Sequence, residues 1–217
     1  MNNLQKRILT AFILLPLSLF FIIKGGWFLV FFLIFVLFAG LHEANTSFKK
    51  RKSILFLSLI LSLSLISIYL LRDDEGTGRI LLYFAITVCI SSDIGGYVFG
   101  KIFKWKKLIS ISPKKTISGV FGSYFFSIIC LVFFIEYYDF ALNLSLNKHE
   151  YLGGYVLAII FSTIAQVGDL IISYFKRIEK IKDTGKILPG HGGIFDRIDG
   201  LMFVVIFAYL INYFYFL

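Results

Sequence analysis

Charged side chains are scarce in this chain, and the shortage excludes an ordinary soluble domain. Only 16% of the 217 residues are Asp, Glu, Lys or Arg, whereas 58% are hydrophobic. A soluble domain of this length has about one quarter charged and about one half apolar residues. Apolar runs of about 20 residues recur instead, which is the length that a helix needs to cross a bilayer. The sequence therefore predicts an all-α, polytopic integral membrane protein.

Cysteine is rare, and the common motifs of soluble enzymes are missing. The chain has only two cysteines, Cys89 and Cys130, and both lie in apolar stretches without a metal-ligating neighbour at a useful spacing. We interpret both as small core residues. The sequence contains no Walker A loop, no zinc-ligand spacing and no Ser/His/Asp set in a recognisable context. Any chemistry must therefore come from other residue types.

Seven apolar segments are candidates for membrane spans. They are residues 8–23, 27–41, 54–71, 80–99, 117–137, 151–172 and 201–217. The first follows Lys6 and Arg7, as a signal peptide would, but no small-residue cleavage site follows it. We interpret it as a retained helix.

The basic residues alternate between the two sides of the predicted membrane. The N-terminal arm and every second connection hold most of the 22 Lys and Arg residues, whereas the other connections hold only Lys24, Arg72, Arg79 and Lys148. Positive connections stay in the cytoplasm, so we predict a cytoplasmic N-terminus and an outer C-terminus. Topology thus accounts for most of the net charge of +9. Binding of nucleic acid has no fold motif behind it, and we expect none.

Polar residues in the sixth segment follow a helical stripe. The steps between them are four, three, four and three residues, and the members are Ser162, Gln166, Asp169, Ser173 and Lys176. This spacing places them on one face of a helix. An ionisable group at membrane depth is costly, so the stripe must face protein or water and is a functional hypothesis by default.

Three further carboxylates share the predicted depth of Asp169. Asp93 lies in the fourth segment, and Asp196 and Asp199 precede the seventh at positions i and i+3. We predict that all four converge on the cytoplasmic side, where nucleotides are. Carboxylate oxygens suit Mg²⁺, which one or two carboxylates hold together with substrate phosphates. Lys and Arg suit phosphate oxygens.

The segment before the seventh span is rich in cations and glycine. Its cations include Lys176, Arg177, Lys180, Lys182, Lys186, His191 and Arg197, and its loop 189–193 reads Pro-Gly-His-Gly-Gly. Glycines let a backbone approach a phosphate closely. Such a site can position two anions for in-line attack at phosphorus. A phosphate nucleophile is already ionised and needs no general base, while a metal and cations offset the repulsion.

Several blocks resemble the phosphatidate cytidylyltransferase (CDP-diglyceride synthetase) family. The signature-like part comprises residues 173–177, 182–185, 188–193 and 196–199, and further blocks are 93–97, 99–100, 112–116 and 166–170. The likeness covers about residues 80–200. Residues 1–79 would add N-terminal helices and 201–217 the last helix of one transmembrane catalytic domain. The chain is shorter than the usual member, and Gly96 and Gly200 stand where Ala and Ser are commoner.

The resemblance implies a reaction and a location. CTP and phosphatidic acid would give CDP-diacylglycerol and pyrophosphate, in phospholipid biosynthesis, as the lipid phosphate attacks the α-phosphorus of CTP. It implies Mg²⁺ as the cofactor, with a monovalent cation such as K⁺ beside it, and it allows a homodimer. We expect the lipid to enter sideways from a bacterial inner (plasma) membrane and CTP to enter from the cytoplasm.

The resemblance also implies roles for individual residues. Metal ligands would be Asp169 and Asp196, with Asp199 as a third. Residues that meet phosphates would be Lys176, Arg177, Lys186, His191 and Arg197. Lys114 and Lys115 would approach the nucleotide or the lipid head group, and Asp93 would orient the cytidine or a more distant cation. Further substrate-binding residues would be Lys182, Asp183, Gly190, Gly192 and Gly193.

Two other classes of membrane protein are alternatives. Another lipid-head-group enzyme would also use such a site, and residues 196–200 fit the Asp-x-x-Asp-Gly start of the CDP-alcohol phosphotransferases. The residues that follow, 201–217, carry no carboxylate, so the rest of that motif is missing. A transporter would use the carboxylates as an ion path, but we find no internal repeats with broken helices.

Overall fold

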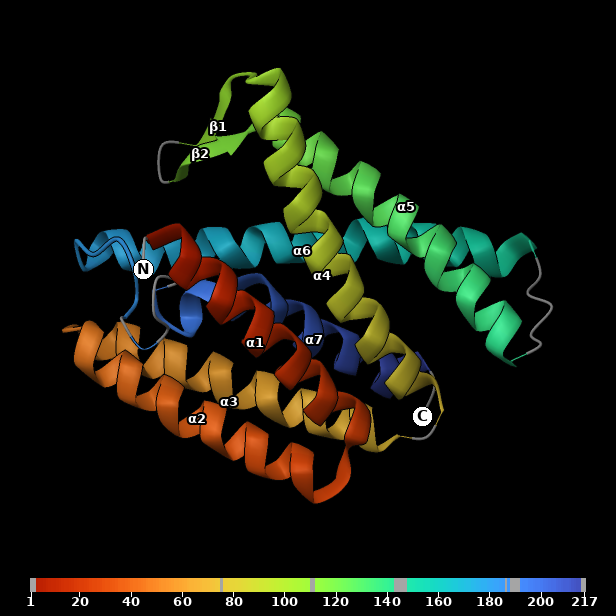
Figure 1. Ribbon diagram of the computed structural model, residues 1–217, viewed down its shortest axis with the longest axis horizontal. Coiled ribbons are helices and arrows are strands. Elements are labelled where there is room, and N and C mark those ends of the chain that lie inside the picture. The colour runs from red at the N-terminus through yellow and green to blue at the C-terminus, as the bar shows by residue number, and fades with distance from the viewer. Residues whose placement is uncertain are drawn as a thin grey trace.

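The computed structural model is an α-helical bundle with a small β-hairpin attached (Figure 1). It describes residues 3–74, 76–109, 112–142, 148–185, 187 and 192–215. Over these residues the helices are α1 Asn3–Lys24, α2 Gly26–Ser47, α3 Arg51–Asp73, α4 Thr77–Phe103, α5 Ile117–Leu142, α6 Lys148–Ile178 and α7 Phe195–Tyr215. The strands are β1 Lys107–Ile109 and β2 Ser112–Thr116.

The predicted polytopic helical membrane protein is confirmed. Helices α2 to α7 each contain a stretch long and apolar enough to cross a membrane, and α1 contributes the shorter apolar stretch Phe12–Lys24 among the described side chains. The helices run further than the predicted spans, and α7 begins at Phe195 rather than at residue 201. Loss of apolarity marks where a helix leaves the hydrocarbon, whereas the helix itself continues into the polar interface.

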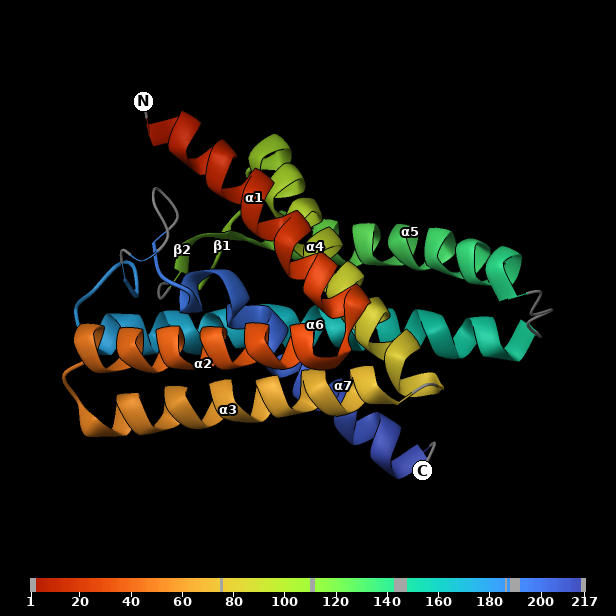
Figure 2. The same cartoon turned by 60° about the horizontal axis from the view of Figure 1, so that its bottom comes forward.

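Helices α2 and α3 form an antiparallel pair, and α6 and α7 pack beside it (Figure 2). Helices α4 and α5 meet at the hairpin and diverge toward the opposite end of the molecule (Figure 1). Small residues bring α4 and α5 together: a Cβ on Gly95 would collide with the Gly122 carbonyl oxygen, and one on Gly96 would lie 2.8 Å from Ser123 Oγ. Small residues on both helices thus allow α4 and α5 to approach closely.

The hairpin was not predicted from the sequence. Its strands pair antiparallel, with Lys107 opposite Thr116 and Ile109 opposite Ser112. It joins α4 to α5 and carries Lys115 toward α6 (Figure 1).

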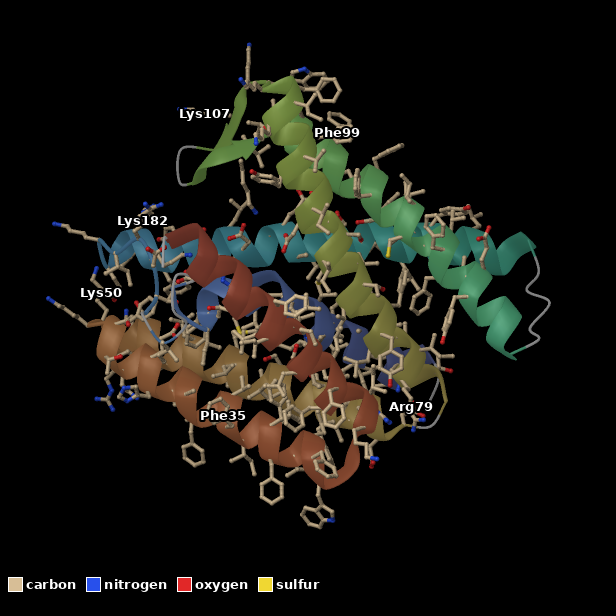
Figure 3. All side chains as sticks on the ribbon, viewed as in Figure 1. Phe35, Lys50, Arg79, Phe99, Lys107 and Lys182 are labelled. Atoms are coloured by element: carbon tan, nitrogen blue, oxygen red, sulfur yellow. The ribbon has the colours of Figure 1, made fainter. Side chains whose placement is uncertain are left out.

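The charges separate along the bundle as the sequence predicts. Lys50 and Lys182 lie at one end of the molecule, and Arg79 lies at the opposite end (Figure 3). The end that holds Lys50 and Lys182 also holds the start of α3 and the end of α6, and the connections there are rich in basic residues. We name this end of the molecule the basic end.

Candidate active site

The polar stripe on α6 faces protein, as its spacing predicts. Ser162 Oγ lies 2.9 Å from Ser92 Oγ of α4, and Gln166 Nε2 donates to Ser162 Oγ at 3.3 Å. One turn further, Ser173 Oγ donates to Asp169 Oδ1 at 3.3 Å. Ser162 is fully buried. Asp169 is therefore held in a polar seam between helices and does not face lipid.

Three of the predicted carboxylates meet in this seam. The carboxyl groups of Asp169 on α6 and Asp199 on α7 lie within hydrogen-bonding reach of each other. Asp93 on α4 lies close enough for its charge to act on both. We name Asp93, Asp169 and Asp199 the carboxylate cluster. From the hairpin, Lys115 Nζ reaches Asp169 Oδ2 at 2.6 Å and donates to the Gln166 carbonyl oxygen at 3.1 Å.

Asp196 is bonded to other partners. Lys176 Nζ donates to Asp196 Oδ1 at 2.8 Å. The backbone N–H groups of Thr184 and Gly193 donate to Asp196 Oδ2 at 2.8 and 3.0 Å. Asp196 and Asp199 both lie in the first turns of α7, but their contacts differ. Asp196 holds the segment before α7, whereas Asp199 belongs to the carboxylate cluster. Lys176 links the two, because its charge also acts on Asp169.

A carboxylate that the sequence analysis did not single out lies beside this segment. Glu43 on α2 is 1% exposed. Its Oε1 accepts from Thr184 Oγ1 at 2.6 Å and from Phe195 N at 3.1 Å, and its Oε2 accepts from Ile194 N at 2.6 Å. The available signal was a lone Glu inside a helix that is otherwise almost free of charge. It was missed because it falls just beyond the predicted span.

The described glycines of the segment lie against carboxylates. A Cβ on Gly193 would collide with Glu43 Oε1 and Thr184 Oγ1, and one on Gly192 would lie 2.6 Å from Asp196 Oδ2. Gly192 also has a φ of 87°, which other residues adopt only with strain. These glycines thus allow the segment to close over two buried carboxylates. Their approach to a phosphate stays a prediction.

The other predicted residues fall into three groups. Arg177 Nη1 donates to the Ile181 carbonyl oxygen at 3.4 Å, and Lys182 and Asp183 are exposed after α6. Arg197 lines the cavity described next. Those outside the described residues are Lys186, Gly190 and His191, and the side chain of Lys114 on β2 is also outside them.

A cavity of about 460 Å³ connects the carboxylate cluster to the lipid-facing surface. Its walls come from α1, α2, α3, α4 and α7, with Ala165 from α6, and are mostly apolar. Among the described residues, the charged members of the lining are Asp93, Arg197 and Asp199. Other lining residues, including Leu15 and Phe35, are exposed on the outer surface of the bundle at 48% and 68%. The cavity therefore has an apolar side that is open to lipid and a wall that carries charged residues.

The carboxylate cluster fits a metal only if a substrate completes the ligands. Among the described residues, no group of three His, Cys, Asp or Glu side chains is arranged to hold a metal ion. Yet Asp169 and Asp199 are in contact, and two carboxyl groups repel unless they share a cation or a proton. Mg²⁺ needs only one or two protein carboxylates and takes its other oxygens from water and phosphates. The donors present fit such a shared site.

Residues 45–215, which include the carboxylate cluster and Asp196, match the sequence profile of the cytidylyltransferase family. This chain belongs to that family. The match includes α3 to α7 and the hairpin, so the resemblance seen in the motifs is confirmed over most of the chain. Glu43 lies just before the matched residues.

Individual family members are similar over different lengths. The phosphatidate cytidylyltransferase of Rickettsia conorii is 33% identical, over 97% of this chain and 92% of that protein. Its counterpart in Rickettsia typhi is 34% identical, over 93% and 88%. The phosphatidate cytidylyltransferase of Staphylococcus haemolyticus is 41% identical, but over 63% of this chain and 49% of that protein. The rickettsial alignments thus extend over nearly the whole chain, including its N-terminal helices.

Proposed function

We propose that this member of the family transfers a cytidylyl group from CTP to phosphatidic acid, giving CDP-diacylglycerol and pyrophosphate. One observation carries the proposal: a single cavity has apolar walls open to lipid and also reaches the carboxylate cluster. A water-soluble nucleotide and a membrane lipid can meet only where these two environments join. Family membership and the three relatives named above support the same reaction.

The lipid would be held by two parts of the cavity. Its acyl chains would lie against the apolar side chains of α1, α2 and α3, while Arg197 would meet its phosphate at the charged wall. This orientation places the lipid phosphate next to Asp93 and Asp199. The lipid would enter sideways between helices, because exposed residues of α1 and α2 form part of the lining.

The transfer itself needs charge compensation more than proton transfer. An oxygen of the lipid phosphate attacks the α-phosphorus of CTP, a new P–O–P bond forms, and the bond to pyrophosphate breaks. The attacking oxygen is already ionised, so no base is required. Lys115 is paired with Asp169 and the charge of Lys176 also acts on it, so both lysines would bind phosphate oxygens when CTP enters. Asp169 and Asp199, with Asp196 nearby, would hold Mg²⁺, which supplies charge neutralisation at the phosphates.

The setting of the site is also part of the proposal. We infer that the basic end faces the cytoplasm of a bacterial inner membrane, because positive connections are retained there and CTP is present there. A K⁺ ion near Asp93 and a homodimer are further arrangements that the family resemblance suggests. Phosphatidic acid and CTP remain the two substrates in either case.

Transfer of label into lipid tests the proposal directly. The full chain is purified in detergent and incubated with CTP labelled in its cytidine, Mg²⁺ and phosphatidic acid, and the organic phase is then counted. We expect label to move only when both the lipid and Mg²⁺ are present, and EDTA to stop it. Absence of transfer by a folded sample contradicts the proposal. Transfer to another lipid phosphate, but not to phosphatidic acid, would replace the acceptor.

A further inference from the structure

Glu43 is a buried carboxylate that the reaction above does not use. It lies near the end of α2, is 1% exposed, and precedes the residues that match the family profile. Its partners are distant in sequence, by 141 residues for Thr184 and by 151 and 152 residues for Ile194 and Phe195. A side chain of the N-terminal helices thus contacts both segments that flank residues 186–191.

Glu43 of α2 and Asp196 of α7 hold the same two segments. Thr184 donates its backbone N–H to Asp196 and its hydroxyl to Glu43. The next segment donates from Gly193 to Asp196 and from Ile194 and Phe195 to Glu43. Each segment is therefore bonded both to Asp196 of α7 and to Glu43 of α2. We name Glu43, Thr184 and Asp196 the clamp.

The charge of Glu43 has a specific place in the fold. Its described contacts come from a hydroxyl and from the two N–H groups at the start of α7. The N-terminus of a helix carries a partial positive charge, and its first N–H groups have no partner within the helix. Glu43 satisfies two of them. A phosphate near this helix start must therefore be held mainly by side chains such as Lys176 and Arg197.

The consequence concerns the residues that follow directly in α7. Asp196, Arg197 and Asp199 lie one to four residues beyond Phe195, so the place of the helix start sets the place of all three. Removing a hydrogen-bond partner from a buried carboxylate costs free energy, so the contacts of Glu43 hold the start of α7 in one place. Glycine at positions 185 and 193 lets the backbone approach Glu43 closely enough for these contacts.

We propose that Glu43 is a positioning residue for the transferase site: it fixes the start of α7 so that Asp196, Arg197 and Asp199 face Asp169 and the cavity. The proposal rests on the proposed function, because it concerns the geometry of that reaction. The hydrogen bonds of Glu43 among the described residues all go to Thr184, Ile194 and Phe195. Its effect passes through the backbone of residues 194–195 and through Thr184.

Glu43→Gln is the primary test, since it keeps the shape but places an NH₂ group against an N–H donor. We expect kcat per folded molecule to fall at least about tenfold, the scale seen when a residue that orients a ligand is changed. We also expect the rise in melting temperature that CTP with Mg²⁺ gives the wild type to shrink. Leu71→Ala is the matched control, because Leu71 is fully buried in α3 at the other end of the bundle. It should lower the melting temperature and leave kcat within about twofold.

A second pair of variants covers the case in which Glu43→Gln does not fold. Thr184→Val removes one hydroxyl from the clamp without a change of shape, whereas Thr184→Ser keeps it. We expect Thr184→Ser to retain the higher kcat of the two. Equal kcat in both, or a kcat for Glu43→Gln within twofold of the wild type, would overturn the proposal. The proposal would also be overturned if Leu71→Ala lowered kcat as much as Glu43→Gln does, because loss of stability alone would then explain the effect.

Hydrogen exchange separates this proposal from the proposed function. In the wild type, the N–H groups of Ile194 and Phe195 should be protected, and Glu43→Gln should expose them while peptides from α5 stay unchanged. If the wild type transfers no label but this protection is lost in the variant, the proposed function is wrong, and Glu43 still fixes the start of α7. If protection is unchanged in the variant, the positioning role is wrong whatever the activity.

Discussion

Asp169 and Asp196 each pair with a lysine, but the two pairs are built differently. Asp196 and Lys176 are 2.8 Å apart with side chains only 9% and 11% exposed, and two backbone N–H groups complete the carboxylate. Asp169 and Lys115 are 2.6 Å apart but are 32% and 23% exposed, and the lysine comes from the hairpin. Asp196 is thus part of the scaffold, whereas Asp169 can exchange its lysine for a ligand. Two carboxylates with the same predicted role therefore have different freedom to perform it.

The largest contrast should appear when each carboxylate is neutralised. We expect Asp169→Asn to lower kcat by about a thousandfold, the effect of removing one charged group from a preorganised site, with little change in melting temperature. Asp196→Asn should lose activity as well, but it should also unfold at a lower temperature, because Lys176 is then left buried without its anion. Label transfer and thermal unfolding in detergent measure the two effects.

The matched design provides its own control. Both variants change one oxygen to an amide nitrogen, so a general effect of Asn would appear in each. Equal melting temperatures for the two variants would show that Asp196 is no more part of the scaffold than Asp169 is. Near-normal transfer by either variant would remove that residue from the proposed metal site.

The lysines should show the same contrast on a smaller scale. Lys176→Met removes the cation from the more buried pair, and we expect a loss of about 3 kcal/mol in the free energy of unfolding. Lys115→Met opens the more exposed pair and should cost about 1 kcal/mol or less. Denaturant or thermal unfolding of the two variants, in one detergent, gives the comparison. A larger loss for Lys115→Met would contradict the assignment of Asp169 as the exchangeable carboxylate.

Asp74 offers a reference carboxylate at the end opposite the basic end. It accepts from Gly76 N, Gly78 N and Asn212 Nδ2 at 2.9, 3.0 and 2.9 Å. The N–H of Gly76 and the amide of Asn212 hold the pKa of Asp74 below its ordinary value. Because the folded pKa is lowered, the stabilisation is complete at neutral pH and is lost as pH falls through that pKa.

We therefore expect Asp74→Asn to reduce the free energy of unfolding at pH 7 by about 1 kcal/mol. The melting temperature should fall slightly as a result. The difference from the wild type should shrink below about pH 4, where the unfolded carboxyl also binds a proton. Melting curves of both proteins at several pH values test this. A difference that grows toward acid would show that the sign of the pKa shift is wrong.

The sequence predicted those features of the molecule that the bilayer constrains, namely the helices and the carboxylates at membrane depth. Hydrocarbon thickness fixes the length and apolarity of a span, so the helices could be found, and the cost of a charge at depth singled out Asp93 and Asp169. The shared depth predicted that four carboxylates converge. The fold brings Asp93, Asp169 and Asp199 together, whereas Asp196 is bonded to Lys176 and to the segment before α7.

The features that the sequence did not reveal depend on contacts between distant segments. Within residues 107–116 apolar and polar residues alternate only over 109–112, which is too short a run to single out a hairpin, so neither the hairpin nor the pairing of Lys115 with Asp169 was predicted. The role of Glu43 depends on partners more than 140 residues away. The local signal, a lone Glu in a helix almost free of charge, indicates that this residue is unusual but does not name its partners.

The open side of the cavity has a consequence for how the reaction should be measured. If the acceptor reaches Asp93 and Arg197 only from within the bilayer, its effective concentration is its mole fraction in that membrane. Diluting phosphatidic acid with an inert lipid, at constant total phosphatidic acid, would then slow the enzyme. The product would be released into the same leaflet, so the enzyme would pass it to the next membrane protein by diffusion in two dimensions.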